Sequence, residues 1–228
     1  MPYCINCGAG VEVGGNFCGS CGNGLGQTAR LGYPISLNRI LFLTIVSFGL
    51  YLFYWFYLTW RHYRDHTGNE AYPIWHALTL LIPIYGLFRI HAHVRSYNEL
   101  MSKSGLLGSI DPMWVVAVFL ITNILGIVAN ILTGGLFGTD DYTFVAAVSA
   151  AILFAVSLAL YLRVLLPIQS DLNRYWESLA NVQIVPSKVR VGEVVFSIIG
   201  LFAWMDTIWG LLSESYRAAG TAGAATPF

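Results

Sequence analysis

The chain has 228 residues, of which 56% are hydrophobic and 11% charged, and its mean hydropathy is +0.63. An ordinary soluble domain carries about 25% charged residues, so this composition argues against a soluble protein and predicts a chain that folds in the lipid bilayer. Twelve Lys and Arg residues balance twelve Asp and Glu residues. This neutral balance argues against nucleic acid as a partner, which would require a basic surface.

The four cysteines form two Cys-x-x-Cys pairs within the first 21 residues, Cys4 with Cys7 and Cys18 with Cys21. Two sulfurs of one tight turn can reach the same ion, and the glycine after each second cysteine permits the positive φ that relaxes such a turn. Four thiolates close a tetrahedral zinc site and leave no position open for water or substrate, so we predict one structural zinc ion. The alternative for these cysteines is a redox pair or a set of disulfides.

Residues 1–24 resemble the short prokaryotic zinc-ribbon family, in which a Phe/Tyr-Cys-x-x-Cys-Gly knuckle repeats across a short β-hairpin. Because so short a module has little core, its folding must come from the metal. The resemblance implies a module for tethering or for interaction with a protein partner. Residues 25–36 contain Gly, Thr, Ser and Pro, and we expect them to form a linker.

Five apolar segments follow, and they predict an all-α polytopic membrane domain over residues 37–212 with about five transmembrane helices. The segments are Leu37–Trp60, Ile74–Ile90, Met113–Thr133, Phe144–Ile168 and Val191–Leu212. The first could extend about 36 Å as a helix, which is enough for a hydrocarbon core of roughly 30 Å. Pro83 removes a backbone donor from the second, so we expect a kink there. Residues 213–228 are predicted to form a disordered tail.

Two amphipathic stretches, Ile90–Met101 and Asp171–Ala180, carry apolar residues at helical spacing with charged residues on the other faces. Each is expected to continue a membrane helix or to lie at the membrane surface. The alternative is that they cap their helices and pack on the ribbon.

The N-terminus is expected in the cytoplasm, because zinc thiolates survive best in a reducing compartment. Five crossings of the cell membrane then place nine Lys and Arg residues inside and only Arg61, Arg64 and Arg217 outside, in agreement with the positive-inside rule. The first external loop fits the five-crossing topology least well, since its sequence RHYRDHTGNE holds two Arg and two His. If the first two apolar segments formed a re-entrant hairpin, this loop would stay inside and three crossings would remain.

The first apolar segment contains the run Gly49-Leu-Tyr51-Leu-Phe-Tyr54-Trp55. With Ile82-Pro83 and the Tyr97-Asn98-Glu-Leu-Met run further on, it makes residues 35–101 resemble an uncharacterised family of prokaryotic multi-pass membrane domains, a domain of unknown function. The hallmark of that family is Gly-x-Tyr-x-x-Tyr-Trp at the close of a membrane helix, often behind an N-terminal zinc ribbon. The resemblance implies a membrane location and no settled activity.

Three polar residues inside the apolar segments are candidate functional residues. Asp206 lies about 9 Å from the end of the fifth segment, where a carboxylate is costly and marks a functional site by default. Trp204 and Trp209 flank it, so the alternative is that Asp206 marks the membrane interface. Asn123 and Asn130 are seven residues apart and should share a helix face, as a contact with a neighbouring helix or as part of a transport pathway.

The histidines are weaker candidates for a functional site, as ligands of a second metal ion. His62 and His66 have the i, i+4 spacing that can bind a metal on a helix. His91 and His93 form a second pair, which could join the first only if the first two apolar segments are re-entrant. The sequence holds no Ser/His/Asp set, no H-E-x-x-H motif, no phosphate loop and no paired intramembrane carboxylates.

These observations predict an integral membrane protein that is a non-enzymatic adaptor or scaffold, whose ribbon binds a cytoplasmic protein. The alternative function is a small transporter or channel subunit that uses Asp206 and the face with Asn123 and Asn130, and this hypothesis predicts a homo-oligomer. A third hypothesis is a membrane enzyme that uses the histidines.

Overall fold

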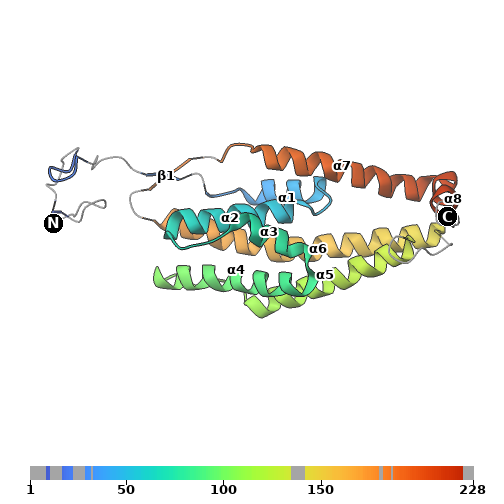
Figure 1. The fold of residues 1–228 in the computed structure, drawn as a ribbon, viewed down its shortest axis with the longest axis horizontal. Coiled ribbons are helices and arrows are strands. Elements are labelled where there is room, and N and C mark those ends of the chain that lie inside the picture. Colours follow the sequence, from blue (N-terminus) through green and yellow to red (C-terminus); the bar gives the residue numbers. More distant parts are fainter. Residues whose placement is uncertain are drawn as a thin grey trace.

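The computed structural model describes residues 9–10, 17–22, 29–31, 33–134, 142–179, 182–185 and 187–222. Within these ranges the chain is mainly helical (Figure 1). The elements in chain order are β1 (Ala29–Leu31), α1 (Leu37–Val46), α2 (Tyr51–Thr67), α3 (Pro73–Leu78), the 3-10 helix η1 (Thr79–Leu81), α4 (Pro83–Lys103), α5 (Pro112–Leu132), α6 (Phe144–Ser178), β2 (Val182–Ile184), α7 (Val191–Leu212) and α8 (Glu214–Ala222).

Three of these helices, α5, α6 and α7, are long and apolar enough to cross a membrane. The protein is therefore a helical membrane protein, as its composition predicts. The prediction of five crossings is wrong, because the described part of the chain holds three such helices. Large apolar side chains on their outer surfaces, such as Phe202 of α7, are exposed as lipid contact requires.

The first apolar segment does not form one helix because it breaks after ten residues. α1 has a length of only about 15 Å, half of a hydrocarbon core. Phe48 and Gly49 then take positive φ values of 56° and 79°, which reverses the chain before α2 begins. The Gly49 N–H donates to the Thr44 carbonyl (2.8 Å), and the Tyr51 N–H donates to Ser47 Oγ (2.8 Å). The turn thus satisfies backbone groups that lipid could not satisfy.

The second apolar segment is divided in the same way. Pro83 was expected to kink one helix, but it is instead the first residue of α4, where proline fits because that position needs no backbone donor. α3 and η1 precede it as short separate helices. The first two segments therefore turn back within the bundle, as in the re-entrant hairpin that the sequence left open.

The tip of α1 lies beside the middle of α7. Gly200 is the tenth residue of α7, about 14 Å along the helix from Val191. A Cβ atom added there would lie 2.2 Å from the Cα and carbonyl carbon of Ser47, so only glycine allows this approach. Trp204 Nε1 also donates to the Ile45 carbonyl (2.8 Å), which satisfies a backbone acceptor in the last turn of α1.

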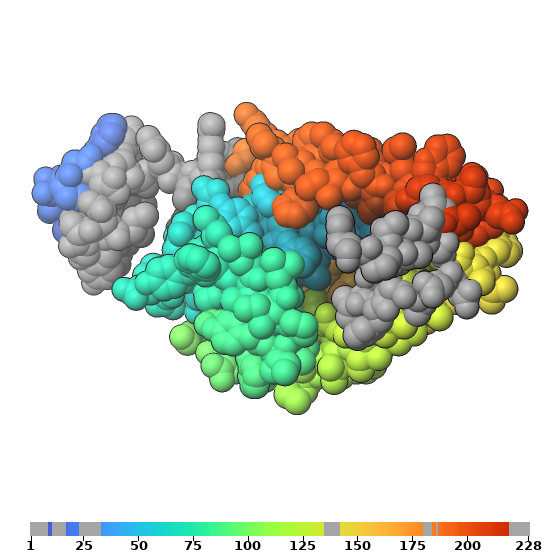
Figure 2. All heavy atoms as spheres, turned by 45° about the vertical axis from the view of Figure 1, so that its right-hand side comes forward, coloured from blue at the N-terminus to red at the C-terminus, as the bar shows by residue number. Residues whose placement is uncertain are grey.

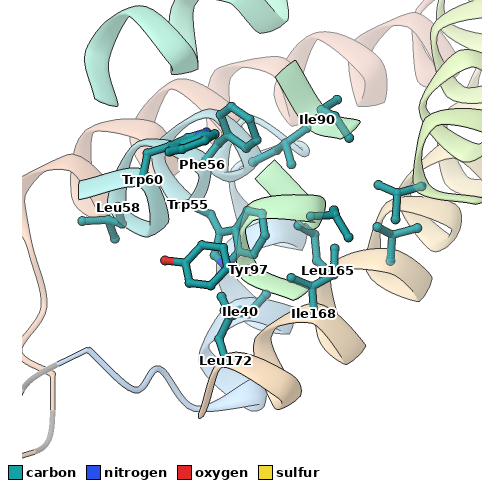
Figure 3. Packing of buried hydrophobic residues seen from close by; sticks show 14 of the residues in the cluster. Ile40, Trp55, Phe56, Leu58, Trp60, Ile90, Tyr97, Leu165, Ile168 and Leu172 are labelled. Carbon is teal, nitrogen blue, oxygen red and sulfur yellow. The ribbon is translucent and has the colours of Figure 1, made fainter. Parts of the chain in front are cut away.

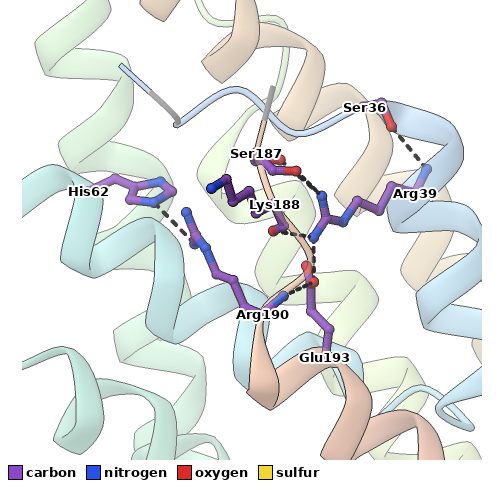
Figure 4. Close-up of polar contacts among 7 residues, drawn as sticks. All are labelled: Ser36, Arg39, His62, Ser187, Lys188, Arg190 and Glu193. Atoms are coloured by element: carbon purple, nitrogen blue, oxygen red, sulfur yellow. Dashed lines mark hydrogen bonds and ion pairs between the residues drawn. The ribbon is translucent and has the colours of Figure 1, made fainter. Parts of the chain in front are cut away.

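At the other end of α1, Arg39 holds the start of α7 (Figure 4). Its guanidinium pairs with Glu193 and donates to Ser187 Oγ (3.1 Å) and to the Lys188 carbonyl (2.7 Å). The Glu193 side chain is only 2% exposed and also accepts from the Arg190 N–H (2.9 Å). α1 is therefore fixed to α7 at both of its ends.

The two amphipathic stretches lie in α4 and in the second half of α6, and their apolar faces point into one core. Ile90 and Tyr97 of α4 and Leu172 of α6 are buried with Trp55 of α2 (Figure 3). The stretch that begins at Asp171 continues α6, one of the three candidate membrane-spanning helices, as predicted, whereas Ile90–Met101 lies in α4, which is not among them. Their apolar faces do not lie on a membrane surface.

Residues 33–36, expected to belong to a linker, are anchored to this core. Tyr33 stacks on His62 with ring centroids 4.2 Å apart, and Ile35 is buried. The Ile35 N–H donates to Asn173 Oδ1 (3.1 Å), and Asn173 Nδ2 donates back to the Ile35 carbonyl (2.7 Å). Just before them, β1 pairs in parallel with β2. In the region expected to be a tail, residues 214–222 form α8.

Candidate functional site

The predicted zinc ligands are only partly described. Cys4 and Cys7 lie outside the described residues, so the site as a whole stays a prediction. In the described part, Cys18 is buried and Cys21 is exposed. Gly22 takes a φ of +68°, which glycine adopts without strain, and its N–H donates to the Cys18 carbonyl (2.8 Å).

Four histidines are packed among aromatic rings in the α2–α4 part of the core. His66 Nε2 lies 2.8 Å from the Tyr175 hydroxyl, and His93 Nε2 lies 2.8 Å from Thr59 Oγ1. Burial, with the positive charge of Arg190 adding at His62, lowers the pKa of His62 to about 3, and burial lowers the pKa of His93 to about 3. Both rings are thus neutral at physiological pH. His76 contacts the same core through Trp60, with ring centroids 4.4 Å apart.

These histidines do not form a metal site. In the ranges that the structure describes, no three His, Cys, Asp or Glu side chains are grouped so that they could bind an ion. His62 and His66 contact different partners, Tyr33 and Tyr175, and His91 does not join them. The described residues therefore give no support to the second metal site that the histidine spacing suggested.

The main polar site is a cavity of about 860 Å³ between α5, α6 and α7. In Figure 2 the orange surface of α7 and the green surface of α4 lie on either side of a recess, with the blue surface of the α1–α2 region at its floor. The polar side chains that line the cavity are Thr122, Asn130, Thr133, Tyr142, Ser157, Tyr161, Asp206, Thr207 and Tyr216. Most belong to the ends of α5 and α7 and the start of α6, which meet at the end of the bundle that carries α8.

Asp206 is the one charged side chain among the described residues that line this cavity. Its carboxylate accepts a hydrogen bond from the Tyr216 hydroxyl. Burial raises the pKa of Tyr142, which also lines the cavity, and the nearby Asp206 charge raises it further. Arg217 is close by, but it donates to two backbone carbonyls at the end of α7 and lies over the Phe144 ring (5.5 Å).

The two asparagines that the sequence placed on one face are divided between two cavities. Asn130 lines the large cavity with Asp206. Asn123 lines a smaller cavity of about 170 Å³ near the start of α4, where its Nδ2 also donates to the Phe119 carbonyl (2.8 Å). The two residues are about 10 Å apart along α5, so a shared face does not give them a shared site.

Aromatic residues separate the two cavities. Phe48 and Tyr161 line both of them. The Phe48 ring stacks on Phe154 with centroids 3.7 Å apart and meets Trp204 edge-on at 5.1 Å. Phe48 is also the one described non-glycine residue with a positive φ, a strained conformation for a bulky side chain. Sequence reasoning missed it, although the Ser47-Phe48-Gly49 run inside an apolar segment is a signal for a break.

Comparison with known proteins gives no match, because no family model, no curated protein and no solved structure is similar to the chain. The function therefore has to be argued from the site. Chemically, the site offers one carboxylate, several hydroxyls and an amide in a cavity between α5, α6 and α7. Phe48 and Tyr161, which we call the aromatic partition, separate this cavity from the smaller one.

Proposed function

We propose that the protein is a small transporter or channel subunit, which receives a polar solute in the cavity between α5, α6 and α7. The observation that carries this proposal is the pair of cavities that meet at Phe48, about halfway along α7. Irregular backbone at such a depth is tolerated only where it is buried in protein or lines a cavity, and the turn at Phe48 does the latter. Broken helices that meet near the membrane centre are a common way to build solute sites in transporters.

The charge distribution supports an orientation with the N-terminus in the cytoplasm. With three crossings, eleven of the twelve Lys and Arg residues fall on the N-terminal side of the membrane, and only Arg217 falls on the other side. This bias is stronger than the one that five crossings would give, and it is the bias expected for the cytoplasmic side of a cell membrane. The large cavity would then lie in the outer half. A protein with three crossings that conducts a solute would also form a homo-oligomer.

The aromatic partition gives the test of this function. Replacing Phe48 by alanine removes the ring that separates the cavities, so we expect solute flux into proteoliposomes to rise about tenfold. Flux of small charged and neutral solutes would be measured with purified protein at equal reconstitution.

Phe42→Ala is the matched control, since Phe42 lies on α1 but is 64% exposed on its surface. No flux through wild type and no rise in Phe48→Ala would contradict the proposal. An equal rise in Phe42→Ala would mean that loss of any α1 ring makes the protein leak.

A membrane adaptor is the second candidate function. We propose it because Tyr33 and Ile35, in the linker that follows the cysteine module, are fixed to the membrane domain. A ribbon with one structural zinc ion on its four cysteines would then be held close to the inner membrane surface, where it could present a cytoplasmic protein partner to the domain. In this proposal the protein is not an enzyme.

Loss of a zinc ligand tests the adaptor function. In Cys18→Ser the ribbon should unfold, so a protein partner crosslinked in intact cells should be lost while the membrane domain still inserts. Mass spectrometry of crosslinked neighbours would be compared with wild type and with Ser20→Ala, a change in the same turn that keeps all four thiolates. Neighbours that are identical in Cys18→Ser and wild type would contradict a role of the ribbon in recruitment.

A further inference from the structure

The cavity between α5, α6 and α7 carries a negative charge that no basic side chain among its described lining residues compensates. Asp206 receives a hydrogen bond from the neutral Tyr216 hydroxyl. Arg217, the residue after Tyr216, donates instead to the carbonyls of Gly210 and Leu211 at the end of α7. Asp206 is exposed where it lines the cavity, and it belongs to a helix that is apolar enough to cross a membrane. A carboxylate inside a membrane segment is costly unless a positive group joins it, so the cavity favours a positively charged occupant.

The size of the cavity sets the kind of cation. A volume of about 860 Å³ is in the range of small-molecule sites, about 300–1,000 Å³, and is far larger than one bare metal ion needs. A metal ion would also require several converging oxygen ligands, whereas Asp206 is the single carboxylate among the described lining residues.

The remaining lining favours an organic cation. Five aromatic side chains face the cavity: Phe48, Tyr142, Phe154, Tyr161 and Tyr216. Aromatic faces attract ammonium groups, most strongly where water is excluded. The alanines of α6 that line the same cavity, Ala147, Ala150 and Ala151, leave room for alkyl groups.

We propose that this cavity binds a small organic cation of the alkylammonium class, with Asp206 as its counter-ion and the aromatic rings around it. The inference rests on the proposed function, since it names the class of solute that the cavity receives. Asn130 and the threonine hydroxyls would bind a polar substituent of the same cation.

The test uses the purified full chain in lipid nanodiscs and isothermal titration calorimetry with choline as the probe. The matched neutral probe is 3,3-dimethyl-1-butanol, which has the shape of choline without its charge. Choline should bind at millimolar concentration or below, and the neutral alcohol should bind about tenfold more weakly or not at all. This comparison needs no variant, so it does not depend on how a variant folds.

Variants of Asp206 then test whether its carboxylate is the group that binds the cation. Asp206→Asn should weaken choline binding about tenfold or more, and Asp206→Glu should restore it in part. Glu99→Gln is the control, because Glu99 is an exposed carboxylate on α4 that pairs only with Arg95 among the described contacts. No choline binding to wild type, equal binding of both probes, or unchanged binding in Asp206→Asn would each overturn the inference.

Flux measurements separate this inference from the function on which it rests. Choline binding that depends on Asp206, without choline flux in proteoliposomes, would support the cation site and contradict transport. Flux of other solutes that rises in Phe48→Ala but is unchanged in Asp206→Asn would support transport and overturn the cation site.

Discussion

Replacing Gly200 by alanine should destabilise the membrane domain by about 2–3 kcal/mol, because a core this closely packed cannot accept an added methyl group without moving backbone. The added Cβ would lie 2.2 Å from two backbone carbons of Ser47 and 2.5 Å from the Val46 carbonyl oxygen. Backbone atoms cannot rotate away as a flexible side chain can, so α1 must leave its place beside α7. Thermal unfolding in detergent, followed by tryptophan fluorescence, measures the loss.

Gly126→Ala is the control for this substitution. Gly126 also lies in a membrane helix, but nothing is found within 4 Å of the position where its Cβ would be. Alanine is the better helix former by roughly 0.5–1 kcal/mol, so this variant should be as stable as wild type or slightly more so. Equal stability of the Gly200 and Gly126 variants would mean that the tip of α1 does not lie against the middle of α7.

Arg39→Ala should cost about 3–5 kcal/mol, the usual effect of leaving a buried charge without its partner. The Glu193 carboxylate would keep only the Arg190 N–H among its described partners, at a position where the side chain is 2% exposed. The same change also removes the guanidinium contacts with Ser187 and Lys188 before α7. Denaturant unfolding of the purified protein measures the free energy of unfolding.

Two further variants show whether the loss comes from the ion pair. Arg39→Ala combined with Glu193→Gln should recover part of the stability, because no buried charge is then left unpaired. Arg95→Ala removes an exposed ion pair with Glu99 and should change stability by less than about 1 kcal/mol. A similarly small effect of Arg39→Ala on stability would show that the ion pair between Arg39 and Glu193 does not hold α1 and α7 together.

The sequence predicted the three candidate membrane-spanning helices well, because long apolar runs carry most of that information. The predicted segment Val191–Leu212 coincides with α7, and Met113–Thr133 differs from α5 by one residue at each end. The first segment was mispredicted because hydropathy records how apolar a stretch is, not whether its backbone continues. Hydropathy does not record the positive φ at Phe48, and part of what fixes that turn is the packing of Ser47 against Gly200 of a distant helix.

The candidate site could be predicted only in part. A carboxylate in an apolar helix stands out in any sequence, so Asp206 was found, and Asn130 was found with it. Their grouping with Tyr142, and the separation of Asn123, depend on how far α7 stands from α5 and α6. Helical spacing on a single helix contains no information about that distance. The role of Phe48 was missed for the same reason.

The number of crossings is the central claim, and labelling of a single introduced cysteine tests it most directly. Asn69 is exposed in the connection between α2 and α3, and Ser215 is exposed at the start of α8. With three crossings, Asn69→Cys should react with a membrane-impermeant maleimide only after the cells are opened, whereas Ser215→Cys should react in intact cells. Labelling of Asn69→Cys in intact cells would instead place that connection outside and contradict the three-crossing fold.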